Sequence, residues 1–116
     1  MYIHQEYIDK NKQNRSDWRL PRISELMLMF DYEEGKPIIE GFTSSFYWSS
    51  TTSAYNANYA WYVNFYTGNT DYGNKTDGSY VRCMRETPDG IVWSKSTKEG
   101  MTWYEAVKYA ESLNEQ

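Results

Sequence analysis

Two strand-like runs at the ends of residues 61–85 enclose a loop made almost entirely of Tyr, Asn, Thr, Asp, Gly and Ser. Residues 51–80 contain six Tyr and five Asn but only three charged residues, in a chain that is 24% charged overall. Tyr supplies rigid amphipathic contact area, while Ser, Gly and Asn supply adaptable hydrogen bonding. This composition predicts strands that present a binding surface, and it is poorly suited to catalysis. A set of ordinary polar surface hairpins is the alternative, since Gly and Asn also mark turns.

Alternation of apolar and polar residues predicts the strands. Residues 46–50 and 60–66 are predicted strands, the second with the period-2 order of a half-buried strand. Its core-facing residues are predicted to be Trp61, Val63 and Phe65. Residues 79–85 form a further predicted strand with Val81 facing inward. The sequence Thr-Pro-Asp-Gly at residues 87–90 should fold it back against residues 91–95 as an antiparallel hairpin, because Pro presets one turn position and Gly accepts a positive φ.

Helices are predicted on either side of these strands. A weak amphipathic helix covers residues 1–14, and a short helix covers residues 22–30 after an extended segment. The strongest helix runs from Thr102 to about Asn114, because Thr102 and Glu105 can form a capping box. Its apolar stripe comprises Trp103, Ala106, Val107, Ala110 and Leu113. The sequence therefore predicts a single α+β domain over residues 1–116, with a small twisted antiparallel sheet and two main helices.

Charge and hydropathy argue against several partners. The net charge of −4 is unsuited to a general nucleic-acid binder, so we expect no nucleic-acid partner. No apolar run approaches the roughly 20 residues of a membrane span, and we expect no membrane insertion. The first residues lack the basic region and apolar core of a signal peptide, which leaves the compartment open.

Residues that carry catalytic or metal-binding chemistry are sparse. His4 is the only histidine and no spaced carboxylate pair stands out, so we do not expect an enzyme. Cys83 is the only cysteine, which excludes an intrachain disulfide and a multi-Cys zinc site, and its pattern predicts a buried thiol. Asp71 and Asp77 carry oxygens of the kind that calcium accepts, but loop Asp residues are mostly turn formers. We therefore expect no metal and no cofactor.

Four motifs occur in order along the chain. They are Asp17-Trp-Arg-Leu-Pro21 with Glu25-Leu26, Tyr47-Trp-Ser-Ser-Thr51, Ala60-Trp-Tyr-Val-Asn-Phe65 and Tyr80-Val-Arg-Cys-Met-Arg85. Together they resemble the bacterial family named for the C-terminal domain of the collagen-like adhesin Lcl. The resemblance implies a C-type-lectin-like fold, shared more distantly with phage tropism determinants and formylglycine-generating enzymes. It also implies a place on a bacterial cell surface or a phage particle.

The order of the elements departs from that family. Residues 90–93 and 101–109 resemble the family's opening strand and first helix, yet here residues 90–114 follow everything else. The chain is then circularly permuted, or cut from a tandem array across a repeat boundary, or completed by a neighbour in a swapped dimer. The turn at residues 87–90 favours packing within one chain.

Two substitutions relative to the family affect its stabilising contacts. The helix position where the family often has a cysteine is Ala110, so the disulfide that the resemblance implies to the position of Cys83 is absent. The family's Thr after Trp-Arg-Leu-Pro is Arg22 here, which removes an expected N-cap worth about 1 kcal/mol.

These observations favour a non-enzymatic recognition module that binds a glycan or a protein. The predicted ligand-binding residues are Tyr62, Asn64, Tyr66, Asn69, Asp71, Tyr72, Asn74, Tyr80 and Arg82. Aromatic faces stack on sugar rings or fill protein pockets, and Asn and Asp fix orientation by hydrogen bonds. Trp18, Trp48 and Trp93 are assigned to the core. The alternative is a structural repeat unit of a bacterial or phage surface protein that has no ligand of its own.

A sharper hypothesis concerns the origin of the polar positions. In some lectin-fold variable proteins, a retroelement randomises adenines in Asn codons and scatters Tyr, Ser, Thr, Asp, Gly and Asn between fixed residues. The positions that suit this pattern are 55–59, 62, 66, 67, 69–72, 74 and 76–79. A fixed Asn/Tyr-rich loop would give the same protein sequence. An imperfect template repeat beside the gene, near a reverse transcriptase, would decide between the two.

Overall fold

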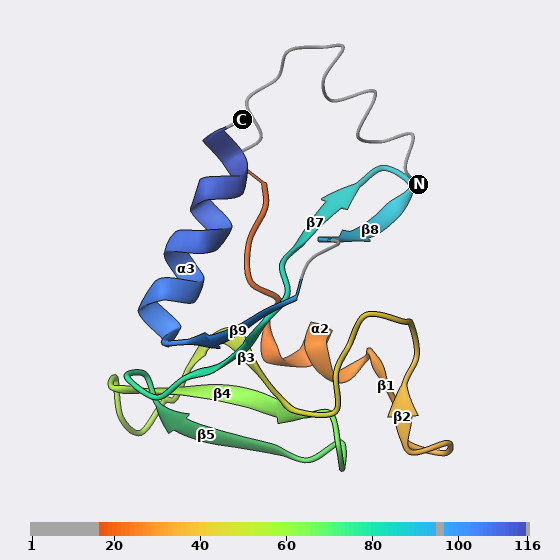
Figure 1. Cartoon of the computed structure of the whole chain (residues 1–116), viewed down its shortest axis with the longest axis horizontal. Helices are drawn as coiled ribbons and strands as arrows, with labels where there is room; N and C mark the ends of the chain where they lie inside the picture. Colours follow the sequence, from red (N-terminus) through yellow and green to blue (C-terminus); the bar gives the residue numbers. More distant parts are fainter. Residues whose placement is uncertain (1–16, 95–96, 116) are drawn as a thin grey trace.

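The computed structural model describes residues 17–94 and 97–115 and shows an α+β fold (Figure 1). Its helices are α2 (Ile23–Met27), α3 (Trp103–Ser112) and the 3-10 helix η1 (Leu113–Glu115). Its strands are β1 (Phe30–Asp31), β2 (Lys36–Pro37), β3 (Phe46–Thr52), β4 (Tyr59–Asn64), β5 (Thr70–Asn74), β6 (Ser79–Val81), β7 (Met84–Thr87), β8 (Gly90–Trp93) and β9 (Lys98–Met101). The predicted α+β class is thus confirmed, while the helix predicted over residues 1–14 lies outside the described residues.

The central sheet has five strands in the spatial order β5-β4-β3-β6-β9, and it is mixed. β4 pairs antiparallel with both β3 and β5, but β6 pairs parallel to β3, with Tyr80 opposite Tyr47. The prediction of an antiparallel sheet is therefore wrong in this respect. Residues 75–78 carry the chain from the β5 edge to the far side of β3, so that it enters β6 in the direction of β3. Two further pairs, β1–β2 and β7–β8, form two-stranded sheets.

The strand predicted over residues 79–85 is interrupted in the structure. It forms β6 and β7, with Arg82 and Cys83 in neither. The chain changes partners at this point, because β6 pairs with β3 and β9 whereas β7 pairs with β8. The predicted hairpin is confirmed between β7 and β8, where Thr87 lies opposite Gly90 and Gly90 has a φ of 129°.

Apolar side chains bury both faces of the central sheet. Trp48 and Tyr47 are neighbours in β3 but enter different cores, because successive side chains of a strand point to opposite faces. The first core contains Leu20, Trp48, Ala60, Val81, Cys83, Ala106 and Ala110, and the second contains Leu26, Phe30, Phe42, Tyr47, Val63 and Phe65. Burial of Trp48, Val63, Phe65 and Val81 was predicted and is confirmed. Trp18 and Trp93 are half-buried against these cores, and Trp61 is half-buried as well.

Helix α3 packs on the sheet of its own chain. The predicted capping box is present, since Glu105 N donates to Thr102 Oγ1 at 3.1 Å and Thr102 N donates to Glu105 Oε1 at 3.0 Å. Trp103 Nε1 donates to the carbonyl oxygen of Ser49 in β3 at 2.9 Å. In the other direction, the Trp48 indole donates to the Met101 carbonyl at 2.9 Å. These bonds fix β9 and α3 against β3.

Helix α2 is shorter than predicted and begins without a capping side chain of its own. Ile23 N donates to Thr51 Oγ1 at 3.0 Å, and Arg22 N donates to Glu25 Oε1 at 2.7 Å. A hydroxyl from β3 thereby satisfies a helix N–H that the first turn leaves unpaired. The Thr51 hydroxyl in β3 thus accepts a hydrogen bond from the first turn of α2, as the hydroxyl of an N-capping threonine at position 22 was expected to do.

Glu25 also fastens α2 to the extended segment before it. Its two carboxylate oxygens accept from Arg19 Nη1 and Nη2, each at 2.8 Å. Hydrogen bonding to Arg19 is the main reason that the pKa of Glu25 falls from 4.5 to about 2. A bidentate pair of this kind is among the stronger hydrogen-bonded contacts in proteins.

We expect Glu25→Gln to lower the free energy of unfolding near neutral pH by about 1–3 kcal/mol. Because the pKa of Glu25 is depressed in the folded state, the wild type holds this stabilisation above pH 4.5 and loses it as the pH falls toward 2. Urea unfolding at several pH values should therefore show that the unfolding free energies of the wild type and Glu25→Gln converge as the solution becomes acidic. Glu33→Gln, in an exposed turn, is the control, and curves for Glu25→Gln and wild type that stay parallel would contradict the assignment.

Candidate functional site

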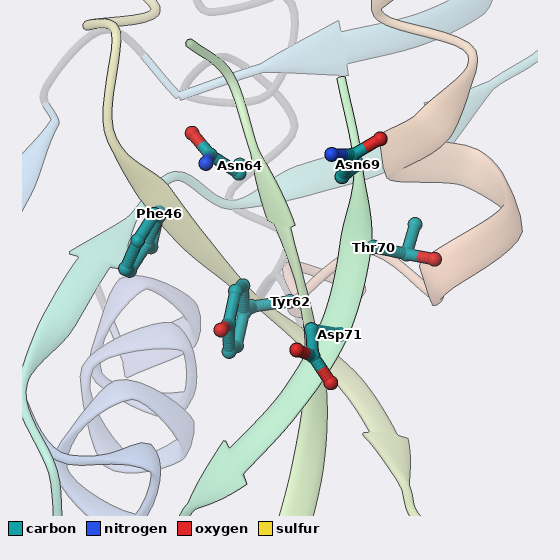
Figure 2. A pocket seen from close by; sticks show the side chains of 6 residues that line it. All are labelled: Phe46, Tyr62, Asn64, Asn69, Thr70 and Asp71. Atoms are coloured by element: carbon teal, nitrogen blue, oxygen red, sulfur yellow. The ribbon is translucent and has the colours of Figure 1, made fainter. Parts of the chain in front are cut away.

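A pocket of about 390 Å³ lies at one end of the β4–β5 pair (Figure 2). It is lined by Phe46 of β3, Tyr62 and Asn64 of β4, Asn69 before β5, and Thr70 and Asp71 of β5. The same face of the sheet carries Trp48 and Ala60, which pack with α3. The helix therefore covers one end of this face, and the pocket occupies the other. Tyr62, Asn64, Asn69 and Asp71 belong to the predicted ligand-binding set.

The register of the strands explains why these side chains converge. Tyr62 lies opposite Asp71 in β5. Asn64 lies opposite Phe46 in β3, and its N–H donates to the Asn69 carbonyl at 2.8 Å. Directly opposed residues of antiparallel strands hold their Cβ atoms about 4.5–5.5 Å apart. Pairing thus gathers side chains from three segments on one side of the sheet, and Figure 2 shows Tyr62 between Phe46 and Asp71.

Two aromatic rings form the apolar wall of the pocket. Phe46 and Tyr62 stack with their centroids 4.9 Å apart and an interplanar angle of 20°. Trp48 meets Tyr62 edge to face at 6.2 Å. Phe46 is 43% exposed, so this ring remains accessible to a ligand. Sequence reasoning missed Phe46, because its face is fixed by pairing with β4 and a run of five residues does not reveal that partner.

The turn between β4 and β5 places the two asparagines. Gly68 has a φ of 84°, and its N–H donates to the Asn64 carbonyl at 2.6 Å. Asn64 Oδ1 accepts from Tyr66 N at 2.9 Å, which fixes the orientation of this side chain. Tyr32 donates its hydroxyl to the Gly68 carbonyl at 2.7 Å, and its ring meets that of Phe30 edge to face at 5.0 Å, so this exposed tyrosine connects the turn to the second core.

The polar atoms of the pocket are partly fixed and partly available. Asp71 Oδ1 accepts from Tyr72 N at 2.8 Å. In the described part of the protein, Asp71 Oδ2 and the Asn69 side chain take part in no hydrogen bond. Burial, and next the Asp71 carboxylate, raise the pKa of Tyr62. The Tyr62 hydroxyl therefore stays protonated at neutral pH and is able to donate. The pocket thus offers one carboxylate, two amides and the Tyr62 hydroxyl beside aromatic rings. The Thr70 side chain lies opposite Val63, on the other face of the sheet.

Five predicted residues lie outside this pocket, and three of them belong to β4, β5 or the turns beside them. Tyr66 follows the end of β4 and is 73% exposed. Tyr72 pairs with Trp61 on the opposite face of the sheet, where their rings meet at 5.1 Å. Asn74 Oδ1 accepts from Thr76 N at 2.9 Å and from Thr76 Oγ1 at 2.7 Å, within a turn. The single continuous surface that we expected is therefore divided between two faces of the β4–β5 pair.

The outward placement predicted for Arg82 is wrong. Only 8% of Arg82 is exposed, Nε donates to the Ser94 carbonyl at 2.7 Å, and Nη1 donates to the Glu40 carbonyl at 3.0 Å. The guanidinium also lies over the Phe42 ring, 4.8 Å from its centroid. Tyr80 is half-buried beside Tyr47, with the ring centroids 5.5 Å apart. Arg82 lies in the break between β6 and β7, where the strand alternation ends. Tyr80 alternates with Val81 in β6, but the face that it occupies is covered by the second core.

Groups suited to covalent or metal chemistry are few in residues 17–94 and 97–115. Cys83 is fully buried, as predicted, and burial raises the pKa of its thiol to about 12. No three His, Cys, Asp or Glu residues of these ranges come together as a candidate metal site. His4 lies outside the described residues. Among the described helices, none has the length and apolar character needed to cross a bilayer.

Comparison with known proteins identifies the family. The sequence model of the Lcl C-terminal domain matches residues 3–85, a span that includes every residue lining the pocket. Residues 90–114 lie outside this match, so the match does not test the predicted change in the order of the elements. No significant match is found among curated proteins or among solved structures. Since the match covers well over half of the chain, this protein belongs to the Lcl C-terminal domain family.

Proposed function

We propose that this domain is a non-enzymatic recognition module that binds a glycan in the pocket between β3, β4 and β5. The observation that carries the proposal is the combination of a stacked Phe46–Tyr62 pair with free polar groups on Asn69 and Asp71. Sugar rings present apolar C–H faces that pack on aromatic rings, and hydroxyls that pair with carboxylates and amides. Membership of a family named for an adhesin domain supports a recognition role.

The size of the pocket favours a glycan over a protein ligand. About 390 Å³ lies within the range of roughly 300–1,000 Å³ typical of small-ligand sites. A stable protein interface buries about 800 Å² on each partner, a larger area than a pocket with six lining residues presents. A sugar residue of a longer glycan fits these dimensions better.

We further propose a C-type-lectin-like fold with a permuted element order. The mixed sheet, the docking of α3 on β3 and the family membership support this assignment. A permuted chain closes on itself through the β7–β8 hairpin and then lays β9 and α3 against its own sheet. A swapped dimer or a tandem array would use the same contacts between molecules. A bacterial cell surface or a phage particle is the proposed location.

Retroelement diversification gains support from the placement of the pocket. Four of its six lining positions, 62, 69, 70 and 71, belong to the set that suits adenine-directed variation. Phe46 and Asn64 do not belong to it. A pocket with two fixed residues and four variable ones would change its ligand while keeping its framework.

The experiment that tests the proposed function is a broad glycan array, probed in calcium and again with a chelator. We expect reproducible binding that falls at least about tenfold in Tyr62→Ala, since losing a central aromatic contact commonly costs more than 1 kcal/mol. Tyr55→Ala removes a ring that is 90% exposed and outside the pocket, and it should bind like the wild type. Circular dichroism melting of each variant checks that the fold is retained.

Other outcomes of the array discriminate among alternatives. A blank array with a folded wild-type domain would contradict glycan binding and favour a protein ligand or a structural repeat. Equal loss of binding in Tyr62→Ala and Tyr55→Ala would place the site elsewhere. Binding that the chelator abolishes would show that a metal takes part.

A further inference from the structure

We propose that Asp71 sets the charge preference of this pocket, so that it selects saccharides bearing a protonated amine and rejects sulfated or carboxylated ones. The inference rests on the proposed glycan-binding function. It adds the chemical class of the ligand and names the residue that determines it.

The charge of the pocket comes from a single carboxylate. Asp71 is the only charged residue among the six that line it. Lys75, four residues further along the chain, is buried; its Nζ donates to Thr52 Oγ1 at 2.9 Å and lies 4.0 Å from the Trp103 ring centroid. Arg82 is committed to two backbone carbonyls in the interior. Neither cation neutralises Asp71, and the pocket keeps a net negative charge.

The Asp71 carboxylate is held in place beside the aromatic rings. Tyr72 N holds Asp71 Oδ1 at 2.8 Å and so fixes the side chain, while Oδ2 has no partner in the described part of the protein. Asp71 lies opposite Tyr62 across the β4–β5 ladder, and its charge contributes to raising the pKa of the Tyr62 hydroxyl. The carboxylate therefore acts on the space beside the aromatic rings, where a sugar would bind.

The two aromatic rings of the pocket also favour a positively charged ligand. The face of an aromatic ring carries negative potential and attracts an ammonium group. Phe46 and Tyr62 thus add to the effect of Asp71, while Asn64 and Asn69 remain to bind hydroxyls. The net charge of −4 on the whole chain further opposes the approach of a polyanion.

Three probes separate the possible outcomes: a hexamer of glucosamine, the same hexamer fully N-acetylated, and heparin. Titrations by calorimetry at about pH 6 keep carboxylates ionised and amines largely protonated. We expect the glucosamine hexamer to bind the wild type about three- to tenfold more tightly than the acetylated one, as for a partly exposed ion pair. Heparin should bind most weakly, and added salt should reduce the preference for the amine.

Asp71→Asn is the informative variant, because it keeps the shape of the side chain and removes the charge. It should bring the affinities for the two hexamers within about twofold of each other. Asp77→Asn removes the same charge from a residue that does not line the pocket, and it should keep the wild-type preference. Tyr62→Ala should weaken binding of both hexamers.

Failure of this inference and failure of the proposed function give different results. Equal binding of the two hexamers by the wild type, tighter binding of heparin, or a preference that survives in Asp71→Asn would overturn the charge assignment while leaving glycan binding intact. Binding of none of the three probes, together with a blank array, would overturn both.

Discussion

Gly68→Ala is expected to destabilise the domain by about 3–5 kcal/mol and to abolish ligand binding. Gly68 has a φ of 84°, and a Cβ built there would lie 2.5 Å from Phe30 Cε2 and 2.7 Å from Tyr32 Cε1. Phe30 is 4% exposed and packed in the second core, so its ring has little room to move. The strain would act on the turn that places Asn64 and Asn69. Urea unfolding and binding to the best glycan of the array measure the two effects.

Gly35→Ala is the matched control for this prediction. Gly35 has a φ of 71°, close to that of Gly68, but an added Cβ would meet nothing within 4 Å. It should therefore report the cost of the backbone conformation alone, about 1–2 kcal/mol. The difference between the two variants measures the clash with the aromatic rings. Equal destabilisation by both would show that packing beneath the turn does not constrain the site.

Arg82→Met should lower the free energy of unfolding by about 2–5 kcal/mol, because one buried and one part-buried hydrogen bond from the guanidinium to backbone carbonyls are lost. These are the carbonyls of Ser94 and Glu40, which Arg82 joins across the fold. The contact of the guanidinium with the Phe42 ring is lost as well. Arg82→Lys keeps the positive charge but lacks the forked donors, and we expect it to recover only part of the loss. Chemical unfolding monitored by tryptophan fluorescence gives both values.

The matched control is Arg22→Met at an exposed position. The Arg22 side chain is 65% exposed and forms one salt bridge with Glu25 at 3.2 Å, so its loss should cost less than about 1 kcal/mol. A stable Arg82→Met variant with impaired ligand binding would contradict the structural role and return Arg82 to the binding surface.

Elements with strong local chemistry could be predicted from the sequence. The capping box of Thr102 and Glu105 and the Pro-Asp-Gly turn at residues 88–90 depend on contacts within a few residues, and both are present. The alternation in β4 likewise predicted that Val63 and Phe65 would be buried. Each of these signals is complete within one short segment of chain.

The errors concern features that depend on distant partners. The position of Arg82 depends on the change of pairing between β6 and β7, and Tyr72 reaches the opposite face because it pairs with Trp61. Phe46 joins the pocket because β3 places it opposite Asn64. The Tyr/Asn-rich composition indicated the pair of strands that lines the pocket, but only the register determines which side chains share a face.

The position of β5 limits how the site can change during evolution. Among the described strands β5 has one neighbour in the sheet, β4, so the unpaired backbone groups along its other edge could pair with a strand of another chain. Charged residues and residues with low strand propensity, such as Asp71 and Gly73, oppose this pairing. Replacing Asp71 with Val or Ile would enlarge the apolar contact with a ligand and make the edge prone to aggregation. If β5 binds a ligand as proposed, solubility restricts the range of ligands that this strand can evolve to bind.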